Sequence, residues 1–465
     1  MTGTSARRAS RASLQELISL ALPVVTVQVG LMAMGVVDTI MVGRISPTAL
    51  AAVALGNLYF YVLAVFGMGT LMVLDPVVAQ AVGAGDRPAI ARALQRGLLI
   101  AAVLSLIVGP LLATAGWTLT AFRQPADVVP IAARYAISCI LGTFPFFTFI
   151  VLRQTLQALG KLRPIVITVI GANVANAGLN WMFVYGKLGA PELGAVGSGW
   201  ASSISRILMA LTLLWIAWPT VRGALLPFHR DVLLIRPLLR MLALGTPIGG
   251  QHILEYAAFA LVALFMGWFG TSQVAAHQVA INLASLTFMV PLGIGSAAAV
   301  LVGRAVGRND PAEARRSAIA SIACGAGFMC ATAAVFLAAP GPLARAYTDD
   351  ARVLGVAVLL IPIAGVFQVF DGLQIVATGV LRGLGDTRTP FVVTMLAYWL
   401  IGTPISFYLG FQTELGPAGL WWGFVAGLAT VALCLLVRVR WLLGRSLARV
   451  HIDDLVDAGA RNQDS

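Results

Sequence analysis

Long apolar runs, separated by short polar segments rich in Gly and Pro, follow one another along almost the whole chain. A membrane-spanning helix needs about 20 apolar residues, and a helix satisfies its own backbone hydrogen bonds in lipid. The runs lack the short alternating segments that are typical of membrane barrels. We therefore predict an all-α polytopic membrane protein with twelve spans. The predicted spans are residues 16–42, 49–80, 94–117, 129–152, 163–185, 194–218, 239–268, 272–303, 316–340, 351–381, 388–410 and 416–438.

The composition agrees with a membrane protein. The 465 residues are 59% hydrophobic and 11% charged, with a mean hydropathy of +0.90, whereas soluble domains carry about 25% charged residues. A net charge of +12 could suggest nucleic acid, but the basic residues lie in short loops between apolar runs. We interpret them as topology signals and expect no nucleic-acid partner. The four cysteines lie inside apolar runs without metal-ligand spacing, so a disulfide scaffold is not expected and we predict no cofactor. We also expect a monomer in the bilayer.

The basic residues also predict the orientation. They are concentrated at the N-terminus and then in every second connection, for example at Arg92 and Arg96, at Arg153 and Lys161, and at Arg304. Cytoplasmic loops carry an excess of Lys and Arg. We therefore predict a cell (inner) membrane protein with both termini in the cytoplasm, whose first apolar run is a span and not a removed signal peptide.

An internal repeat divides the chain into two halves. The segment AVGAGD at Ala81–Asp86 matches AVGRND at Ala305–Asp310, and ELGAVG at Glu192–Gly197 matches ELGPAG at Glu414–Gly419. Because six spans is an even number, both halves enter the membrane from the same face, which predicts two six-helix lobes related by a parallel pseudo-two-fold repeat. The predicted parts are an N-terminal tail at 1–15, an N-terminal lobe at 16–218, a linker at 219–238, a C-terminal lobe at 239–443 and a C-terminal tail at 444–465.

Three predicted spans carry an acidic residue within the apolar run: Asp38, Glu255 and Asp371, the last near the middle of its span. A charge at that depth costs about 2.5–3.5 kcal/mol even on the lenient insertion scale, and such residues usually bind an ion or a proton. No two of the three are repeat mates. We predict that they couple transport to a cation, either Na⁺ or H⁺, with Na⁺ a candidate ligand of Glu255 and Asp371. The alternative is that each acid only pairs with a neighbouring helix.

Several polar residues are candidate partners of these acids. Asn176 and Asn180 are four residues apart and share one helix face, so we expect them near Asp38, with Gln28 and Ser202 in the same network. Interhelical hydrogen bonding is the alternative for these residues.

His252 precedes Glu255 by three residues and could relay a proton or simply bond a carbonyl. Asp75, next to Pro76, either lines a wet region or lies near the cytoplasmic end of its span.

Soft, repackable side chains suit varied apolar cations. The candidate substrate-cavity residues are Phe367, Tyr256, Met34, Met266 and Met289, and core packing is the alternative for each. The sequence contains no phosphate-binding loop, no H-E-x-x-H motif and no G-x-S-x-G motif, so we predict neither ATP drive nor an enzyme.

Four segments together are similar to one known family. MGVVDTIMVGR, PVVAQAVGAGD, NWMFVYGKLGAPELGAVGSG and DGLQIVATGVLRGLGDTRTP, in this order on twelve spans, resemble the multidrug and toxic compound extrusion (MATE) family, and within it the NorM-type branch. The resemblance implies a cation-coupled antiporter that exports organic cations and drugs. It places Glu255 and Asp371 in the coupling site of the C-terminal lobe, and Asp38 with Asn176 and Asn180 in the N-terminal lobe.

The sequence departs from the family pattern at two positions. Phe367 stands where relatives often have tyrosine, and Asp75 stands where relatives usually have an uncharged residue. Two alternative functions remain open at this stage: a flippase of lipid-linked precursors from the same superfamily, and a membrane-embedded enzyme. The coupling ion, the substrate, the stoichiometry and the oligomeric state are also open.

Overall fold

A computed structural model describes residues 2–453 of the chain, with side chains from Leu14 onward. Over these residues every regular element is a helix and no strand occurs, which confirms the predicted all-α class. The part of the predicted C-terminal tail beyond Asp453 lies outside the described residues.

Twelve candidate spans are present in the described chain, as the sequence predicts. Eleven helical segments of the described chain are long and apolar enough to cross a membrane, and two shorter helices that meet at a 49° bend make the twelfth when they are counted as one span. Because each segment closes its own backbone hydrogen bonds, its apolar side chains can face lipid without leaving the main chain unsatisfied.

The helices of the first half of the described chain follow the predicted spans closely. They are α1 (Thr2–Gly43), α2 (Pro47–Leu71), α3 (Leu74–Gly83), α4 (Arg87–Ala113), α5 (Ala115–Ala121), α6 (Val129–Ser138), α7 (Ile140–Ala158), α8 (Arg163–Tyr185), α9 (Ala195–Leu225) and the short 3₁₀ helix η1 (Arg230–Leu233). Helix α1 begins before its predicted span, which starts at residue 16.

The helices of the second half include one irregular element, a π-helix between α15 and α16. The helices are α10 (Ile235–Phe269), α11 (Thr271–Gly307), α12 (Pro311–Ala338), α13 (Pro340–Arg345), α14 (Ala351–Gly383), α15 (Arg388–Leu396), the π-helix η2 (Ala397–Gly402), α16 (Thr403–Phe411) and α17 (Pro417–Leu442).

The described chain forms two compact units. The N-terminal unit contains Thr26–Gly249 together with the described residues from His451, and the C-terminal unit contains Gly250–Val450 together with the described residues up to Val25. The change from one unit to the other therefore falls inside helices α1 and α10. The lobe and linker boundaries given by the sequence stay a prediction.

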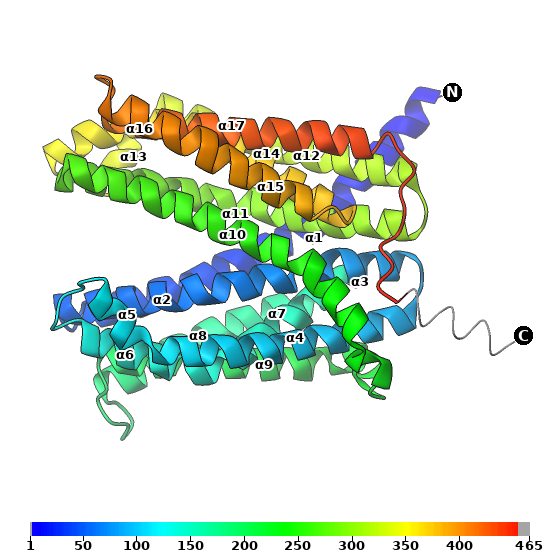
Figure 1. Ribbon diagram of the computed structural model, residues 1–465, viewed down its shortest axis with the longest axis horizontal. Helices are drawn as coiled ribbons and strands as arrows, with labels where there is room; N and C mark the ends of the chain where they lie inside the picture. Colours follow the sequence, from blue (N-terminus) through cyan, green and yellow to red (C-terminus); the bar gives the residue numbers. More distant parts are fainter. Residues whose placement is uncertain (1, 454–465) are drawn as a thin grey trace, which may run out of the picture. The chain divides into compact units, whose positions relative to one another are not determined.

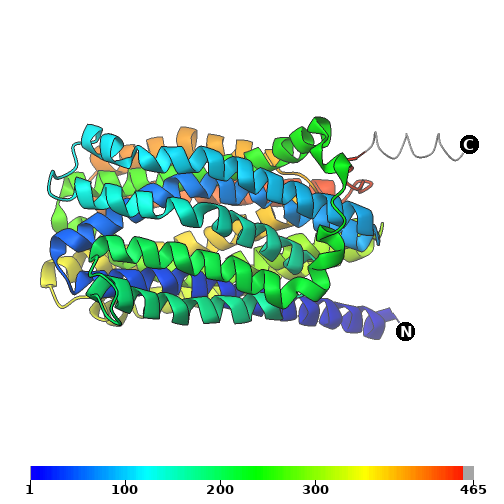
Figure 2. The same cartoon turned by 90° about the horizontal axis from the view of Figure 1, so that it is seen from below.

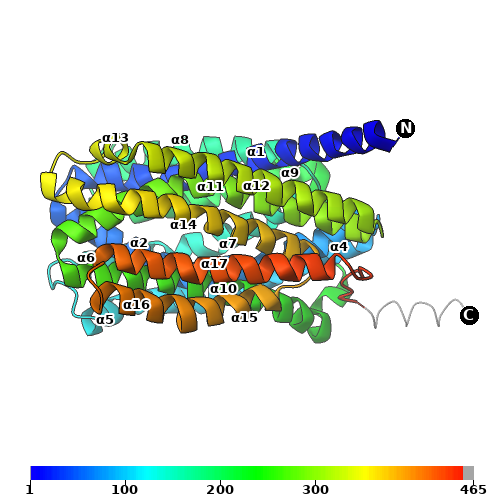
Figure 3. The ribbon, with the colours of Figure 1, turned by 90° about the horizontal axis from the view of Figure 1, so that it is seen from above.

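Each unit is a bundle of helices whose axes are roughly parallel (Figures 1, 2 and 3). In the N-terminal unit α9 packs on α7 and α8, and α7 packs on α4 (Figures 1 and 2). In the C-terminal unit α14 packs on α11, α12 and α17 (Figure 3). Helix α14 is thus central to its unit.

The internal repeat is visible in the local geometry of its turns. The amide of Asp86 donates to the carbonyl of Ala81, and the amide of Asp310 donates to that of Ala305, each at 2.9 Å. Both aspartates then cap the next helix, α4 and α12 respectively, by accepting a backbone N–H with a side-chain oxygen. Capping by Asp supplies a partner for one of the open donors of a helix start.

A second pair of repeat mates requires glycine. Gly194 and Gly416 have φ values of +55° and +53°, a region that residues other than glycine rarely adopt. Each residue directly precedes a helix, α9 or α17. The two halves therefore enter their last span through the same turn.

The bent span α6–α7 breaks at Cys139, upstream of Pro145. A proline removes a backbone donor and pushes its ring against the preceding turn, which bends a helix. The carbonyl of Ser138 at the break accepts a hydrogen bond of 2.6 Å from the Ser203 hydroxyl on α9. The neighbouring helix thus satisfies a backbone group that the bend leaves open.

Helices α11 and α14 approach closely because glycines face each other. A Cβ atom on Gly379 would overlap the carbonyl oxygen of Gly295, and one on Gly383 would lie 2.7 Å from the carbonyl oxygen of Ala299. Small residues let membrane helices gain van der Waals contact along their backbones. This contact fixes the position of α14 in the C-terminal unit.

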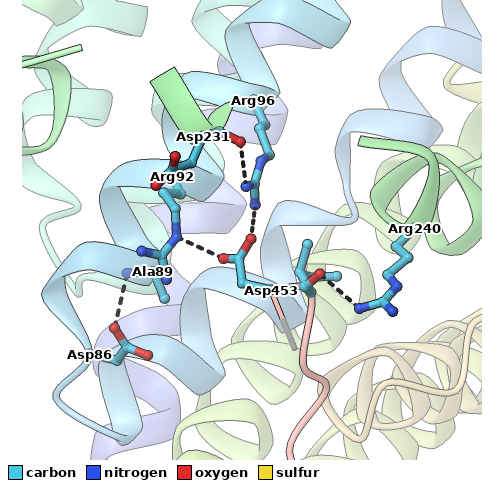
Figure 4. A network of polar contacts seen from close by, with 8 residues as sticks. Asp86, Ala89, Arg92, Arg96, Asp231, Arg240 and Asp453 are labelled. Atoms are coloured by element: carbon cyan, nitrogen blue, oxygen red, sulfur yellow. Dashed lines mark hydrogen bonds and ion pairs between the residues drawn. The ribbon is translucent and has the colours of Figure 1, made fainter. Parts of the chain in front are cut away.

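The C-terminal segment ends in an ionic cluster within the N-terminal unit (Figure 4). The carboxylate of Asp453 lies 2.7 Å from Arg92 and 2.7 Å from Arg96, both on α4. Arg96 also donates to the carbonyl of Asp231 at 3.1 Å, and Arg240 donates to the carbonyl of Ile452 at 3.1 Å. After α17 the chain therefore leaves the C-terminal unit and binds the N-terminal unit.

Candidate functional site

Glu255 on α10 accepts two hydrogen bonds from amide side chains of the C-terminal unit. The Gln251 Nε2 atom, one helical turn away, donates to Oε1 at 2.9 Å, and the Gln374 Nε2 atom of α14 donates to the same oxygen at 2.6 Å. The other oxygen, Oε2, accepts no hydrogen bond from the side chains that the structure describes. One carboxylate oxygen is therefore held in place and the other has unused acceptor capacity.

Tyr398 orients the amide of Gln374. Its hydroxyl lies 3.3 Å from Gln374 Oε1 as a donor, and its side chain is only 1% exposed. With the amide oxygen occupied by a donor, the amide nitrogen points to Glu255. Tyr398 lies in the π-helix η2, and such bulges are frequent at functional sites.

Asp371 on α14 lies near Glu255 and interacts with it electrostatically. Its side chain is half-buried, and neither carboxylate oxygen accepts a hydrogen bond from the residues described. Gln374 follows Asp371 by three residues and so lies on the same face of α14. The structure therefore brings both predicted acids of the C-terminal unit to one place.

The charges around this pair do not cancel. Among the residues that the structure describes, Arg382, also on α14, is the basic residue that interacts electrostatically with Glu255. Asp371 also interacts electrostatically with Glu255. With both carboxylates ionised, two negative charges face one positive charge. A proton or a monovalent cation would neutralise the remainder, and carboxylate oxygens with free lone pairs are suitable ligands for a hard cation.

Asp38 on α1 has a different environment, in the N-terminal unit. Its Oδ1 accepts a hydrogen bond of 2.6 Å from Asn180 Nδ2 on α8, and its Oδ2 accepts one of 2.8 Å from the Ser202 hydroxyl on α9. Asn176 lies beside the same carboxylate, but its side-chain amide makes no hydrogen bond in the described structure. Both oxygens of Asp38 are therefore occupied by protein donors.

Arg206 on α9 is the basic residue that interacts with Asp38. The two side chains interact electrostatically, and each is 7% exposed. The guanidinium carbon of Arg206 lies 3.8 Å from the ring centroid of Phe60 and 5.3 Å from that of Phe146, so both rings contribute cation–π stabilisation. Asp38 thus has a positive charge of its own unit in its surroundings.

Gln28 and Asp75 lie in another part of the N-terminal unit. Gln28 accepts a hydrogen bond of 3.3 Å from Arg153 Nη1 on α7 and does not join the Asp38 network that the sequence predicts for it. Asp75 is fully buried on α3 and interacts electrostatically with the same arginine. Ten residues of helix separate Gln28 from Asp38, or about 15 Å along α1, which is why the two cannot share partners.

The candidate substrate residues divide into packed and accessible side chains. Phe367 is 1% exposed and packs against Trp421 and Phe424, with ring centroids 5.4 Å and 5.3 Å away. Met266 is fully buried and Met34 is 9% exposed. In this conformation Phe367 and Met266 are core residues, closed to a substrate. The more accessible residues are Tyr256, which is 39% exposed, and Met289 and His252, which are half-buried.

Sequence reasoning missed four residues that the structure places at these two sites: Gln251, Gln374, Tyr398 and Arg206. The glutamines carried a signal, because each is one helical turn from an acid. Arg206 carried one as well, because it is a charged residue inside the predicted span 194–218. Tyr398 carried none, since it lies on a helix that is distant in sequence from the acid it approaches.

Comparisons with family models, with curated proteins and with solved structures all indicate the same family. The MatE family model matches residues 23–182 and 247–408. Multidrug resistance protein MdtK of Edwardsiella ictaluri is 37% identical over 439 residues, covering 92% of this chain and 95% of that protein. Probable multidrug resistance protein NorM of Bradyrhizobium diazoefficiens is 35% identical over 439 residues, with 92% and 94% covered.

Solved structures show the same fold at lower identity. The eukaryotic MATE transporter AtDTX14 superposes with a TM-score of 0.83 at 21% identity, covering 94% of this chain and 100% of that one. An outward-facing multidrug resistance MATE family transporter of the MOP superfamily has a TM-score of 0.83 at 20% identity, with 93% and 96% covered. These similarities confirm a transporter, as opposed to an enzyme, and they show that the chain belongs to the MatE family of multidrug and toxic compound extrusion transporters.

Proposed function

We propose that this chain is a secondary active multidrug efflux antiporter, which exports organic cations and drugs in exchange for Na⁺ or H⁺ by alternating access. The relatives named as multidrug resistance proteins support drug export. The proposal includes an inner-membrane location with both termini in the cytoplasm and a single chain as the transporting unit.

The observation that carries the proposal is the difference between the two acid sites. At Glu255 and Asp371 three oxygens lack a protein donor, and one negative charge is left over after Arg382 is counted. At Asp38 both oxygens have donors and Arg206 places a positive charge in the surroundings. The first site therefore favours the binding and release of one cation, and the second favours a structural or positioning role.

Coupling requires that the ion and the drug favour different states of the protein. A ligand with equal affinity for two states shifts no equilibrium between them. A cationic drug and the coupling ion would compete for the same excess negative charge, so binding of one would promote release of the other. This competition is the chemical basis of the exchange that we propose.

The test is export of a cationic dye from proteoliposomes, driven separately by a Na⁺ gradient and by a pH gradient. We compare the wild type with Asp371→Asn, Glu255→Gln and Asp38→Asn. We expect the first two variants to lose gradient-driven export, because each removes the excess negative charge. Asp38→Asn should keep its response to the gradient even if its rate falls. The gradient that drives the wild type identifies the ion.

Glu414→Gln is the matched control, because Glu414 is an exposed carboxylate of the same unit in the turn before α17. It should transport like the wild type. Export by Asp371→Asn at the wild-type rate under both gradients would rule out this acid as a coupling residue. Failure of the wild type to move any cationic dye would instead refute the export of organic cations.

A further inference from the structure

A cavity of about 600 Å³ lies between α12 and α17 in the C-terminal unit. This volume is within the usual range of small-molecule sites, about 300–1,000 Å³. Both helices pack on α14 and both are candidate membrane spans. The cavity is remote in sequence from the acid pair, and the antiport chemistry described above does not use it.

The polar side chains that line the cavity are two arginines. Arg315 lies in the second turn of α12 and Arg440 in the last turn of α17, and no acidic residue lines the cavity. Neither arginine forms an ion pair within the described chain, whereas the nearby Glu313 and Asp386 are already paired with Arg308 and Arg438. The cavity mouth therefore carries two uncompensated positive charges.

The walls of the cavity are aliphatic and continue along the spans. Ile319 and Ile322 follow Arg315 at helical spacing on one face of α12, and Leu436 precedes Arg440 by one turn of α17. Ile319 is 56% exposed, so this wall is open toward lipid. On both helices an arginine marks the polar end of the groove and aliphatic side chains mark its deeper part.

Trp441, which follows Arg440, indicates that this end of the groove lies at the membrane surface. Its ring is 43% exposed and lies 3.4 Å from the guanidinium carbon of Arg445 and 4.5 Å from that of Arg438. Tryptophan is enriched at membrane–water interfaces. The two arginines of the cavity are thus at the depth of lipid headgroups.

From this geometry we propose that the groove between α12 and α17 is a binding site for one anionic glycerophospholipid, whose phosphate pairs with Arg315 and Arg440 and whose acyl chains lie on Ile319, Ile322 and Leu436. Basic pockets between membrane helices recognise anionic headgroups in this way. An apolar cation would be repelled by the two arginines, and a zwitterionic lipid would gain less from them. The bound lipid joins α12 to α17 across α14, the helix that carries Asp371.

The test is native mass spectrometry of the full chain in detergent, titrated with dioleoyl phosphatidylglycerol. Dioleoyl phosphatidylcholine tests the need for a negative headgroup, and sn-glycerol 3-phosphate tests whether a free phosphate is enough. We expect one tight phosphatidylglycerol, weaker phosphatidylcholine binding and no binding of glycerol phosphate. The double substitution Arg315→Gln with Arg440→Gln should weaken phosphatidylglycerol binding about 25-fold, since each interfacial arginine contributes about fivefold.

The matched control is Arg316→Gln with Arg388→Gln. It removes the same charge from two exposed arginines that do not line the cavity, and it should keep the wild-type affinity. Arg315→Lys with Arg440→Lys keeps the charge, should retain most of the binding and serves if the Gln variant does not fold. Equal losses in the cavity and control variants, unchanged binding in the cavity variant, or glycerol phosphate binding at the same strength would each overturn the proposal.

Discussion

The ionic cluster at the end of the described chain allows a quantitative prediction for Asp453→Ala. The Asp453 side chain is 9% exposed and bridges Arg92 and Arg96, whose side chains are 13% and 1% exposed. Removing one partner of a buried ion pair costs about 3–5 kcal/mol because the other charge stays buried without compensation. Arg96 keeps its hydrogen bond to the carbonyl of Asp231, so we expect the lower end of that range, about 3 kcal/mol.

The assay is thermal unfolding of the purified protein in detergent, followed by tryptophan fluorescence. For a body of about 200 residues, 1 kcal/mol lowers Tm by roughly 2–4 °C, so Asp453→Ala should lower the Tm of the N-terminal unit by about 6–12 °C. Asp349→Ala is the control, because Asp349 is exposed and has no ion pair among the described residues. Its Tm should equal that of the wild type.

A double-mutant cycle separates the ion pair from other effects of the substitution. If Asp453 and Arg96 interact as described, the losses from Asp453→Ala and Arg96→Met will not add, and the coupling will lie within about 0.5–3 kcal/mol. A Tm change below about 1 °C for Asp453→Ala would mean that the segment leaves its site and water hydrates the arginines, as for a surface pair. That result, or fully additive losses, would refute the reasoning.

Three further predictions concern single side chains. Ser202→Ala removes one of the two donors to the acid on α1 and should cost about 1–3 kcal/mol in thermal unfolding, whereas Ser205→Ala, which removes a buried hydroxyl without a partner among the described residues, should cost nothing. Gly379→Ala should destabilise the protein by about 1–3 kcal/mol or more, because its Cβ would overlap a backbone carbonyl of α11. Gly327→Ala, which has open space around its Cβ, should not destabilise it. Equal Tm values for the two variants would contradict the close helix contact. Backbone amides in the first turn of α14 donate hydrogen bonds to Asp350 and hold its pKa below the usual 3.8. The stabilisation from Asp350 is therefore present above pH 3.8 and is lost as the pH falls through the lower pKa of the folded state. Below this folded-state pKa, hydrogen exchange of the first turn should speed up beyond the intrinsic pH effect, and unchanged protection would contradict the prediction.

The sequence alone determined the helices, the number of spans and the repeat. These features are local, because span length follows from counting apolar residues and turns such as those before α9 and α17 depend on a few residues that include Gly194 and Gly416. It also located the three acids inside the spans, since a carboxylate in an apolar run stands out without any knowledge of its neighbours.

Only the tertiary structure decided which side chains meet those acids. Gln374 reaches Glu255 across 119 residues of sequence, Arg206 approaches Asp38 from another helix, and Gln28 turns instead to Arg153. Such partners depend on the rotation and axial position of each helix against the next. Helices that are apolar on most faces carry only a weak periodic signal for that rotation, and it is fixed by close contacts such as that of Gly379 with Gly295. The return of Asp453 to α4 likewise follows from the packed fold, because a short polar segment after the last span has no pattern that names its partner.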